Sequence, residues 1–529
     1  MKTVTLVSLP VASGLLATLA FPGVDLGFLA WFALAPFLLA LRQPGPLAGA
    51  GLGFLFGCVF VGGVFRWLGT LAMMTPTRVV LMYAALALYF AVFGLLYAKA
   101  ARVAGPWIVL GAPALWVGLE YARSNFSFLA LPWNLLGHSQ YRYLVAIQIA
   151  DLTGVYGVSF LVVLANQVLS QMADRLVARK WRRPSPDLHG AGEPSWAGLF
   201  VILVVAVVPV LAYGWYSLAA PEPGERVRVA LVQANVLARN NMTGREHTAH
   251  LRAYEQLTRQ AAAQAPDLVV WPSSSLPAPL EFLHVSYFVS RVAQEARSYL
   301  LVGGAGGEKL GPRIDGYLAY SNSEFLLSPS GRIERQYNKI RLTPFDEYVP
   351  LQGRVRWPRW ITTLEESFRA GGEYTIFEVG AARFGVPICW ENSLPEVVRQ
   401  FVARGANLVI SVTNEGFFGP TAAPYQTLAM NVFRAIENRV TVVRAATTGV
   451  SAFISSKGEI LGRVTDGAGR DLFVSGILVR DVPLATARTF YTARGDIFGQ
   501  AVTILAAIIA LLCLLPDRWS PWRSPCPAA

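Results

Sequence analysis

The chain has 529 residues, of which 54% are hydrophobic and only 15% charged, and its formal net charge is +12 at pH 7. Soluble globular proteins carry about 25% charged residues, so this composition argues against an ordinary cytosolic enzyme. The apolar content is also too high for a disordered chain, because such chains lack the residues to bury a core. The composition therefore predicts a membrane protein that also carries a soluble region.

Apolar segments dominate the first 218 residues and return near the C-terminus. A transmembrane helix needs about 20 mostly apolar residues. Segments near that standard predict a bundle of about eight spans, seven of them in a membrane domain over 1–218, at 4–21, 26–42, 47–68, 79–100, 104–122, 144–173, 196–218 and 498–515. The first segment could pass for a signal peptide, but further spans follow at once, and we expect it to be retained.

The basic residues of the membrane region predict its orientation. Cytoplasmic loops are enriched in lysine and arginine, and most basic residues near the spans can be placed on one side together with Lys2 and the cluster at 175–183. Arg66, Arg78, Arg123 and Arg142 fit that side less well. With a cytoplasmic N-terminus, we expect residues 226–497 to lie outside the cytoplasm and 498–529 to form the last transmembrane helix and a cytoplasmic tail. Much of the basic excess is then topological, and we expect no nucleic-acid partner.

Residues 226–497 alternate short apolar strands with helical stretches, which indicates a layered α/β domain. In such domains the functional groups gather where strands end. The expected strands are 227–233, 268–271, 300–303, 384–389 and 408–412, and the expected helices are 255–265, 286–297, 395–405 and 425–438.

Cys389 is the candidate nucleophile, because it ends a predicted strand and is followed by an aromatic residue and a carboxylate. The four cysteines form no CxxC pair and no Cys/His ligand spacing, so neither a zinc site nor a disulfide framework is expected. A nearby Lys339 would favour the thiolate. On the residues alone both remain candidates, since a single buried cysteine is commonly structural.

Several motifs together resemble one family. They are Trp271-Pro272-Ser273, Tyr337-Asn338-Lys339, the run Pro344-Phe345-Asp346-Glu347, Pro387-Ile388-Cys389-Trp390-Glu391, and the membrane stretches 116–123 and 131–140. The set resembles the carbon–nitrogen hydrolase (nitrilase) superfamily and, with the predicted spans, is similar to the apolipoprotein N-acyltransferase family over essentially the whole chain. The resemblance implies an extracytoplasmic αββα sandwich.

The resemblance also assigns roles to residues. It implies that Cys389 is the nucleophile, Lys339 the catalytic lysine and Glu347 the supporting glutamate. Glu391, two residues after the nucleophile, and Trp390 are expected to bind the substrate. Tyr337 is grouped with them, although it lies in the segment 337–350 that carries Lys339, which we call the lysine loop, and it could instead shape that segment.

Position 273 departs from the family pattern. The family carries a glutamate there as general base, and a serine hydroxyl does not titrate near neutral pH. Three explanations remain open: Glu347 acts as the base, the chain is a divergent homologue with altered or lost activity, or a single residue was changed deliberately. A second departure is Arg239-Asn240-Asn241, where a tryptophan is usual, and a third, milder one is Trp390, where a tyrosine often follows the cysteine.

The family resemblance implies a ping-pong acyl transfer without a metal or an organic cofactor. Cys389 would take an acyl chain from a membrane phospholipid as a thioester and pass it to the α-amine of a lipoprotein's diacylglyceryl-cysteine. Lys339 and a backbone N–H would hold the oxyanion. Two alternatives are a non-catalytic lipid- or lipoprotein-binding protein, for which Ser273 is the reason, and a membrane-tethered amidase. We expect a monomer.

Overall fold

The computed structural model describes residues 3–71, 74–103, 105–180, 194–222, 224–236, 242–307, 320–362, 364 and 367–514. The chain divides into two compact units. One combines Met1–Ala219 with Asp496–Ala529, and the other is Ala220–Gly495.

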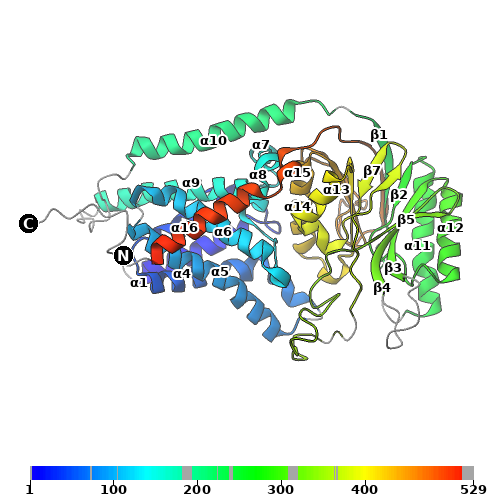
Figure 1. Ribbon diagram of the computed structural model, residues 1–529, viewed down its shortest axis with the longest axis horizontal. Coiled ribbons are helices and arrows are strands. Elements are labelled where there is room, and N and C mark those ends of the chain that lie inside the picture. Colours follow the sequence, from blue (N-terminus) through cyan, green and yellow to red (C-terminus); the bar gives the residue numbers. More distant parts are fainter. Residues whose placement is uncertain are drawn as a thin grey trace, which may run out of the picture. The chain divides into compact units, whose positions relative to one another are not determined.

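The regular secondary structure in the described part of the first unit is helical (Figure 1). Its helices are α1 (Thr3–Leu19), α2 (Ala30–Ala33), α3 (Ala35–Leu41), α4 (Pro46–Val64), α5 (Pro76–Val103), α6 (Ile108–Asn125), α7 (Leu144–Ile147), α8 (Ala150–Thr153), α9 (Val155–Lys180), α10 (Trp196–Ala219) and α16 (Ile497–Leu514). Among the described residues, α4, α5, α9 and α10 contain stretches long and apolar enough to cross a membrane. The prediction of several long apolar helices in this part of the chain is thereby confirmed, while the number of eight spans stays a prediction.

Helices α4 and α5 pack closely through glycines. A Cβ built on Gly49 would lie 2.6 Å from the carbonyl oxygen of Gly94, and one built on Gly53 would collide with the carbonyl oxygen of Phe90. Small residues let helix backbones approach in an environment where lipid removes the hydrophobic driving force. The glycines of this pair are therefore packing residues.

Two of the predicted apolar segments are not continuous helices. The segment 26–42 breaks between α2 and α3, where Oδ1 of Asn166 accepts hydrogen bonds from the backbone N–H groups of Leu34 and Ala35 at 2.7 and 2.9 Å. The segment 144–173 is divided into α7, α8 and α9, with Gly154 at φ 63° before α9. Apolar content predicts compatibility with lipid, but it does not report backbone breaks that side chains or glycines make possible.

The second unit contains two six-stranded sheets. The first sheet has the order β12-β1-β2-β3-β4-β5, with parallel pairing from β1 to β3, and the second has the order β11-β10-β9-β8-β7-β6, with parallel pairing from β7 to β9. The strands are β1 (Arg226–Gln233), β2 (Leu268–Val270), β3 (Tyr299–Gly307), β4 (Tyr320–Leu327), β5 (Ile333–Asn338), β6 (Phe377–Val379), β7 (Ala382–Gly385), β8 (Leu408–Thr413), β9 (Thr441–Ala446), β10 (Ala452–Ile454), β11 (Ile460–Arg463) and β12 (Gly476–Pro483).

The two sheets face each other and helices cover their outer faces (Figure 1). Alternate strand residues such as Leu231, Val270 and Leu301 fill the core that the sheets share, together with Ile410 and Val443 of the second sheet. Their neighbours on the first sheet point outward and pack with α11 (Gly244–Ala262) and α12 (Leu283–Ala296). The helices α13 (Pro395–Ala403), α14 (Ala423–Asn438) and the short α15 (Phe490–Arg494) accompany the second sheet. The predicted α/β domain is confirmed.

Candidate functional site

Cys389 lies at a sharp turn after β7. The predicted strand 384–389 is too long, because β7 ends at Gly385, and Cys389 instead begins a 3-10 turn over Cys389–Ser393. Pro387 has no N–H to donate to a ladder, and only an isolated bridge from Ile388 to Val412 continues the pairing. Cys389 has a φ of 51°. Such a conformation is uncommon for a residue with a side chain and clusters at functional sites.

The surroundings of Cys389 favour its thiol form. Burial is the largest influence and raises the pKa of Cys389, and the carboxylates of Glu347 and Glu415 raise it further. The positive charge of Lys339 and a hydrogen bond with the side chain of Thr413 lower it, but the net direction is upward from 9.0. At neutral pH the sulfur therefore carries its proton, and a nucleophilic attack requires a group that removes it.

Lys339 and Glu347 form a buried ion pair. Nζ of Lys339 lies 2.6 Å from Oε2 of Glu347 and 3.2 Å from Oγ1 of Thr343. Burial alone would lower the pKa of Lys339, but Glu347, the Cys389 sulfur and Glu391 together raise it above 10.5. Lys339 is consequently a fixed positive charge beside the thiol, which suits it to stabilise an oxyanion.

Glu347 has little freedom to act as a base. Its Oε2 accepts hydrogen bonds from Lys339 and from the Thr343 N–H at 2.7 Å, and its Oε1 accepts one from Nδ2 of Asn322 at 2.8 Å. Burial raises the pKa of Glu347, but Lys339 and these hydrogen bonds outweigh it and leave the pKa below 4.5. The arrangement makes Glu347 the partner that holds Lys339 in place.

Glu391 joins the lysine loop to the turn that carries Cys389. Both of its oxygens accept hydrogen bonds from the hydroxyl of Tyr337, at 2.9 and 3.0 Å. The backbone N–H groups of Ile340 and Arg341 donate to Oε1, and that of Ile388 donates to Oε2, each at 2.9 Å. Glu391 and Tyr337 are fully buried. This geometry favours positioning roles for both over substrate contact, whereas Trp390 is partly exposed at the same turn.

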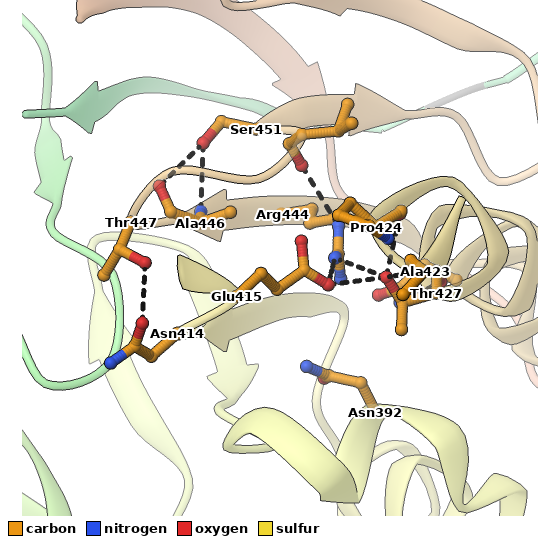
Figure 2. A network of polar contacts seen from close by, with 12 residues as sticks. Asn392, Asn414, Glu415, Ala423, Pro424, Thr427, Arg444, Ala446, Thr447 and Ser451 are labelled. Carbon is orange, nitrogen blue, oxygen red and sulfur yellow. Dashed lines mark hydrogen bonds and ion pairs between the residues drawn. The ribbon is translucent and has the colours of Figure 1, made fainter. Parts of the chain in front are cut away.

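A second buried network supports the site from the end of β8 (Figure 2). Glu415 forms an ion pair with Arg444 of β9 at 2.5 Å and accepts a hydrogen bond from Thr427 of α14 at 2.6 Å. The neighbouring Asn414 accepts a hydrogen bond from Thr447 at 2.9 Å. These contacts hold in place the chain that follows Thr413, whose side chain is hydrogen-bonded to Cys389.

Ser273 lies beyond β2 and is 1% exposed. Sequence reasoning missed a carboxylate beside it, that of Glu324 on β4, which is also fully buried. It missed Asn322 and the Glu415–Arg444 pair as well. The strand β4 was not among the predicted ones, and a lone acidic residue in Ser321–Phe325 was the only signal for Glu324. Arg239, Asn240 and Asn241 lie outside the described residues.

Comparisons with known proteins cover both units. Residues 13–168 match the family model of the apolipoprotein N-acyltransferase N-terminal domain, and residues 228–491 match that of carbon-nitrogen hydrolase. The chain is 37% identical over 514 residues to the apolipoprotein N-acyltransferase of Geobacter metallireducens, covering 95% of this chain and 94% of the relative. It is 29% identical over 554 residues to that of Chlorobaculum tepidum, with coverages of 96% and 97%. A solved amidase from Nesterenkonia sp. is 20% identical, with a TM-score of 0.36, and covers 53% of this chain and 94% of the amidase.

Proposed function

Because the chain belongs to the apolipoprotein N-acyltransferase family, it is a lipoprotein acyltransferase, and we propose that Cys389 carries the acyl chain as a thioester. The observation that carries this proposal is the fixed positive charge of Lys339 beside a cysteine held at φ 51°. A charged donor there would stabilise the oxyanion of each half-reaction.

The reaction would proceed in two halves. In the first, the Cys389 sulfur attacks the ester carbonyl of a phospholipid, the thiol proton leaves, and the lyso-lipid departs with a proton on its alcohol oxygen. In the second, the α-amine of a diacylglyceryl-cysteine attacks the thioester and loses a proton, the carbon–sulfur bond breaks, and the departing sulfur regains its proton. Lys339 stabilises both tetrahedral oxyanions, and Glu347 keeps it charged and in position. Glu391 and Tyr337 hold the lysine loop against the turn of Cys389.

The membrane placement completes the proposal. We infer eight spans, with a seven-span domain over 1–218, a catalytic domain over 226–497 on the periplasmic side of the inner membrane, and a last span within 498–529. The basic residues on one side of the spans and the apolar helices α4, α5, α9 and α10 support this topology. Both substrates are lipids, so a catalytic domain joined to membrane spans meets them without extracting either from the bilayer. We propose that the chain acts as a monomer.

The experiment asks whether a thioester forms. The full chain, reconstituted in phospholipid vesicles with a radiolabelled acyl chain, should acquire label that neutral hydroxylamine removes, and mass spectrometry should locate the label on Cys389. Cys389→Ala should not label, whereas Cys58→Ala, in the helical unit, should label normally. Label that persists in Cys389→Ala, or its absence from the unsubstituted chain, would overturn the proposal, and the second result would favour the lipid-binding alternative that Ser273 raised.

A further inference from the structure

Within the described residues, the carboxylates that bind Lys339 and the turn of Cys389 are committed to other donors, so neither is placed to take the proton from the Cys389 thiol. Position 273 is a serine, and the pKa of Cys389 lies above its ordinary value. Glu347 is paired with Lys339 and two further donors, so protonating it would break the ion pair on which the lysine depends. A proton acceptor must come from elsewhere in the site.

Glu324 lies next to the backbone of Ser273. The two sit on opposite sides of Gly303 of β3, which pairs with Glu324 in the sheet. A Cβ built on Gly303 would collide with Oε1 of Glu324 and would lie 2.7 Å from Cα of Ser273. A side chain from position 273 and the side chain of Glu324 can therefore reach the same small volume above Gly303, from opposite directions. The absence of a side chain on Gly303 keeps that volume open.

The volume lies on the face of the sheet that carries the other site residues. Residues two apart on a strand share a face, and Glu324 stands between Asn322, which binds Glu347, and Leu326, which packs between the two sheets. Across the next strand Glu324 pairs with Tyr337, whose hydroxyl binds Glu391. Glu324 thus faces the space between the sheets, in the row of side chains that holds Lys339.

No hydrogen bond within the described residues accounts for the burial of the Glu324 carboxylate. Within the described part of the chain neither of its oxygens has a hydrogen-bond partner. An unpartnered buried carboxyl group destabilises a fold by several kcal/mol when it is ionised, so its presence calls for a functional explanation. Glu347, Glu391 and Glu415, the other carboxylates of the site, each have at least one donor, and of their oxygens only Oε2 of Glu415 has no partner among the described residues.

We propose that Glu324 is the general base of this acyltransferase and replaces, from strand β4, the carboxylate that position 273 lacks. The inference rests on the proposed thioester chemistry of Cys389. It makes Glu324 a catalytic residue for both half-reactions and explains how Ser273 can stand in a working site.

The proton balance runs through one carboxyl group. Glu324 accepts the thiol proton as the Cys389 sulfur bonds to the ester carbon, and it returns that proton to the alcohol oxygen of the departing lyso-lipid. It then accepts a proton from the α-amine as the new amide bond forms and returns it to the Cys389 sulfur when the carbon–sulfur bond breaks. Burial raises the pKa of Glu324 well above 4.5. The raised value brings the acceptor closer to the thiol in proton affinity, as general base catalysis requires.

The test moves the carboxylate back to position 273. Glu324→Gln keeps the shape of the side chain but cannot accept the proton, and it should slow thioester formation about 10²–10⁴-fold. The double variant Ser273→Glu with Glu324→Ala supplies a carboxylate to the same volume from the other side, and it should recover labelling to within about tenfold of the unsubstituted chain. Glu378→Gln, which removes an exposed carboxylate of β6, is the matched control and should label normally.

The outcomes distinguish the role of Glu324 from the proposed thioester chemistry of Cys389. If the unsubstituted chain forms no thioester, the proposed role of Cys389 is wrong. If that chain labels and Glu324→Gln labels at the same rate, Glu324 is not the base. If Glu324→Gln loses labelling but the double variant, folded as judged by its melting temperature, does not recover it, Glu324 has a structural role and the inference is wrong.

Discussion

Nζ of Lys339 and Oε2 of Glu347 lie 2.6 Å apart, and only 1% and 9% of the two side chains are exposed. Two charges so deeply buried are stable only as a pair, because each alone would lose its hydration without compensation. The pair thereby supplies a permanent positive charge to a site that is largely shielded from water.

Breaking this pair should destabilise the domain in a pH-dependent way. Glu347→Gln leaves Lys339 buried without its counter-charge, and we expect a loss of about 3–5 kcal/mol of unfolding free energy at pH 7. The pKa of Glu347 is lowered, so its contribution is present above pH 4.5 and is lost as the pH falls through the folded pKa. The pKa of Lys339 is raised, so its contribution is present below pH 10.5 and is lost as the pH rises through the folded pKa. Denaturant unfolding of the full chain in detergent, followed by tryptophan fluorescence from pH 3 to 11, measures the difference.

The control for this experiment is the exposed pair of Arg383 and Glu378. Glu378→Gln should cost less than about 1 kcal/mol, because exposed ion pairs contribute little. A Glu347→Gln variant as stable as Glu378→Gln would contradict a structural role for the buried pair.

Alkylation of Cys389 should be slow at neutral pH. The pKa of its thiol is raised, so the rate of modification by iodoacetamide should keep rising beyond pH 9. Lys339→Met removes the charge that lowers this pKa and should shift the profile to still higher pH. Lys457→Met, at a lysine that bonds to Ala220, should leave the profile unchanged. Mass spectrometry of the Cys389 peptide gives the rates, and a half-maximum near pH 7 would contradict the expected environment.

Tyr337→Phe should loosen the lysine loop. The change removes the only side-chain donor that the described residues offer to Glu391 and leaves three backbone N–H groups. Removing one partner of a buried group costs about 1–3 kcal/mol, and Lys339, two residues along, should be less well placed. We expect a lower melting temperature and a several-fold slower thioester formation. Tyr287→Phe, on the exposed face of α12, should change neither.

Arg444→Met should be one of the most damaging changes away from the reacting atoms. It leaves Glu415 buried without its counter-charge at the end of β8, as Figure 2 makes clear, and should cost about 3–5 kcal/mol. Arg463→Met, which breaks a partly exposed pair with Asp471, should cost much less. Comparison of the two unfolding midpoints tests the claim, and equal midpoints would show that the buried pair is dispensable.

Gly303→Ala should impair the reaction, because its methyl group would occupy the space of Oε1 of Glu324 and crowd Cα of Ser273. We expect thioester formation to fall at least tenfold while the domain stays folded. Gly467→Ala, where a methyl group meets nothing within 4 Å, is the control. If Gly303→Ala forms the thioester normally, the carboxylate volume above Gly303 has no part in the chemistry.

Strongly apolar elements of the fold were predictable from the sequence. The segments 227–233, 268–271, 300–303 and 408–412 were predicted as strands because they are short apolar runs, and they correspond to β1, β2, β3 and β8. The strands β4 and β5 were not predicted, since β5 is polar and the first five residues of β4 are interrupted by polar side chains, with an apolar run only at 325–327. These are the strands that bring Asn322, Glu324 and Tyr337 to the site.

The sequence by itself determined the membrane character, the α/β domain and the motif residues Cys389, Lys339, Glu347 and Glu391, because composition, periodicity and motifs are local properties of a chain. It also marked position 273, a serine in this chain, as the place where the family's general-base glutamate is missing. Only the tertiary structure decided that Glu347 is committed to Lys339, that Glu391 is committed to Tyr337 and the lysine loop, and that Glu324 lies across Gly303 from Ser273. The position of Glu324 depends on the pairing of β4 with β3 and β5, and no local pattern reports which side chains a sheet brings side by side.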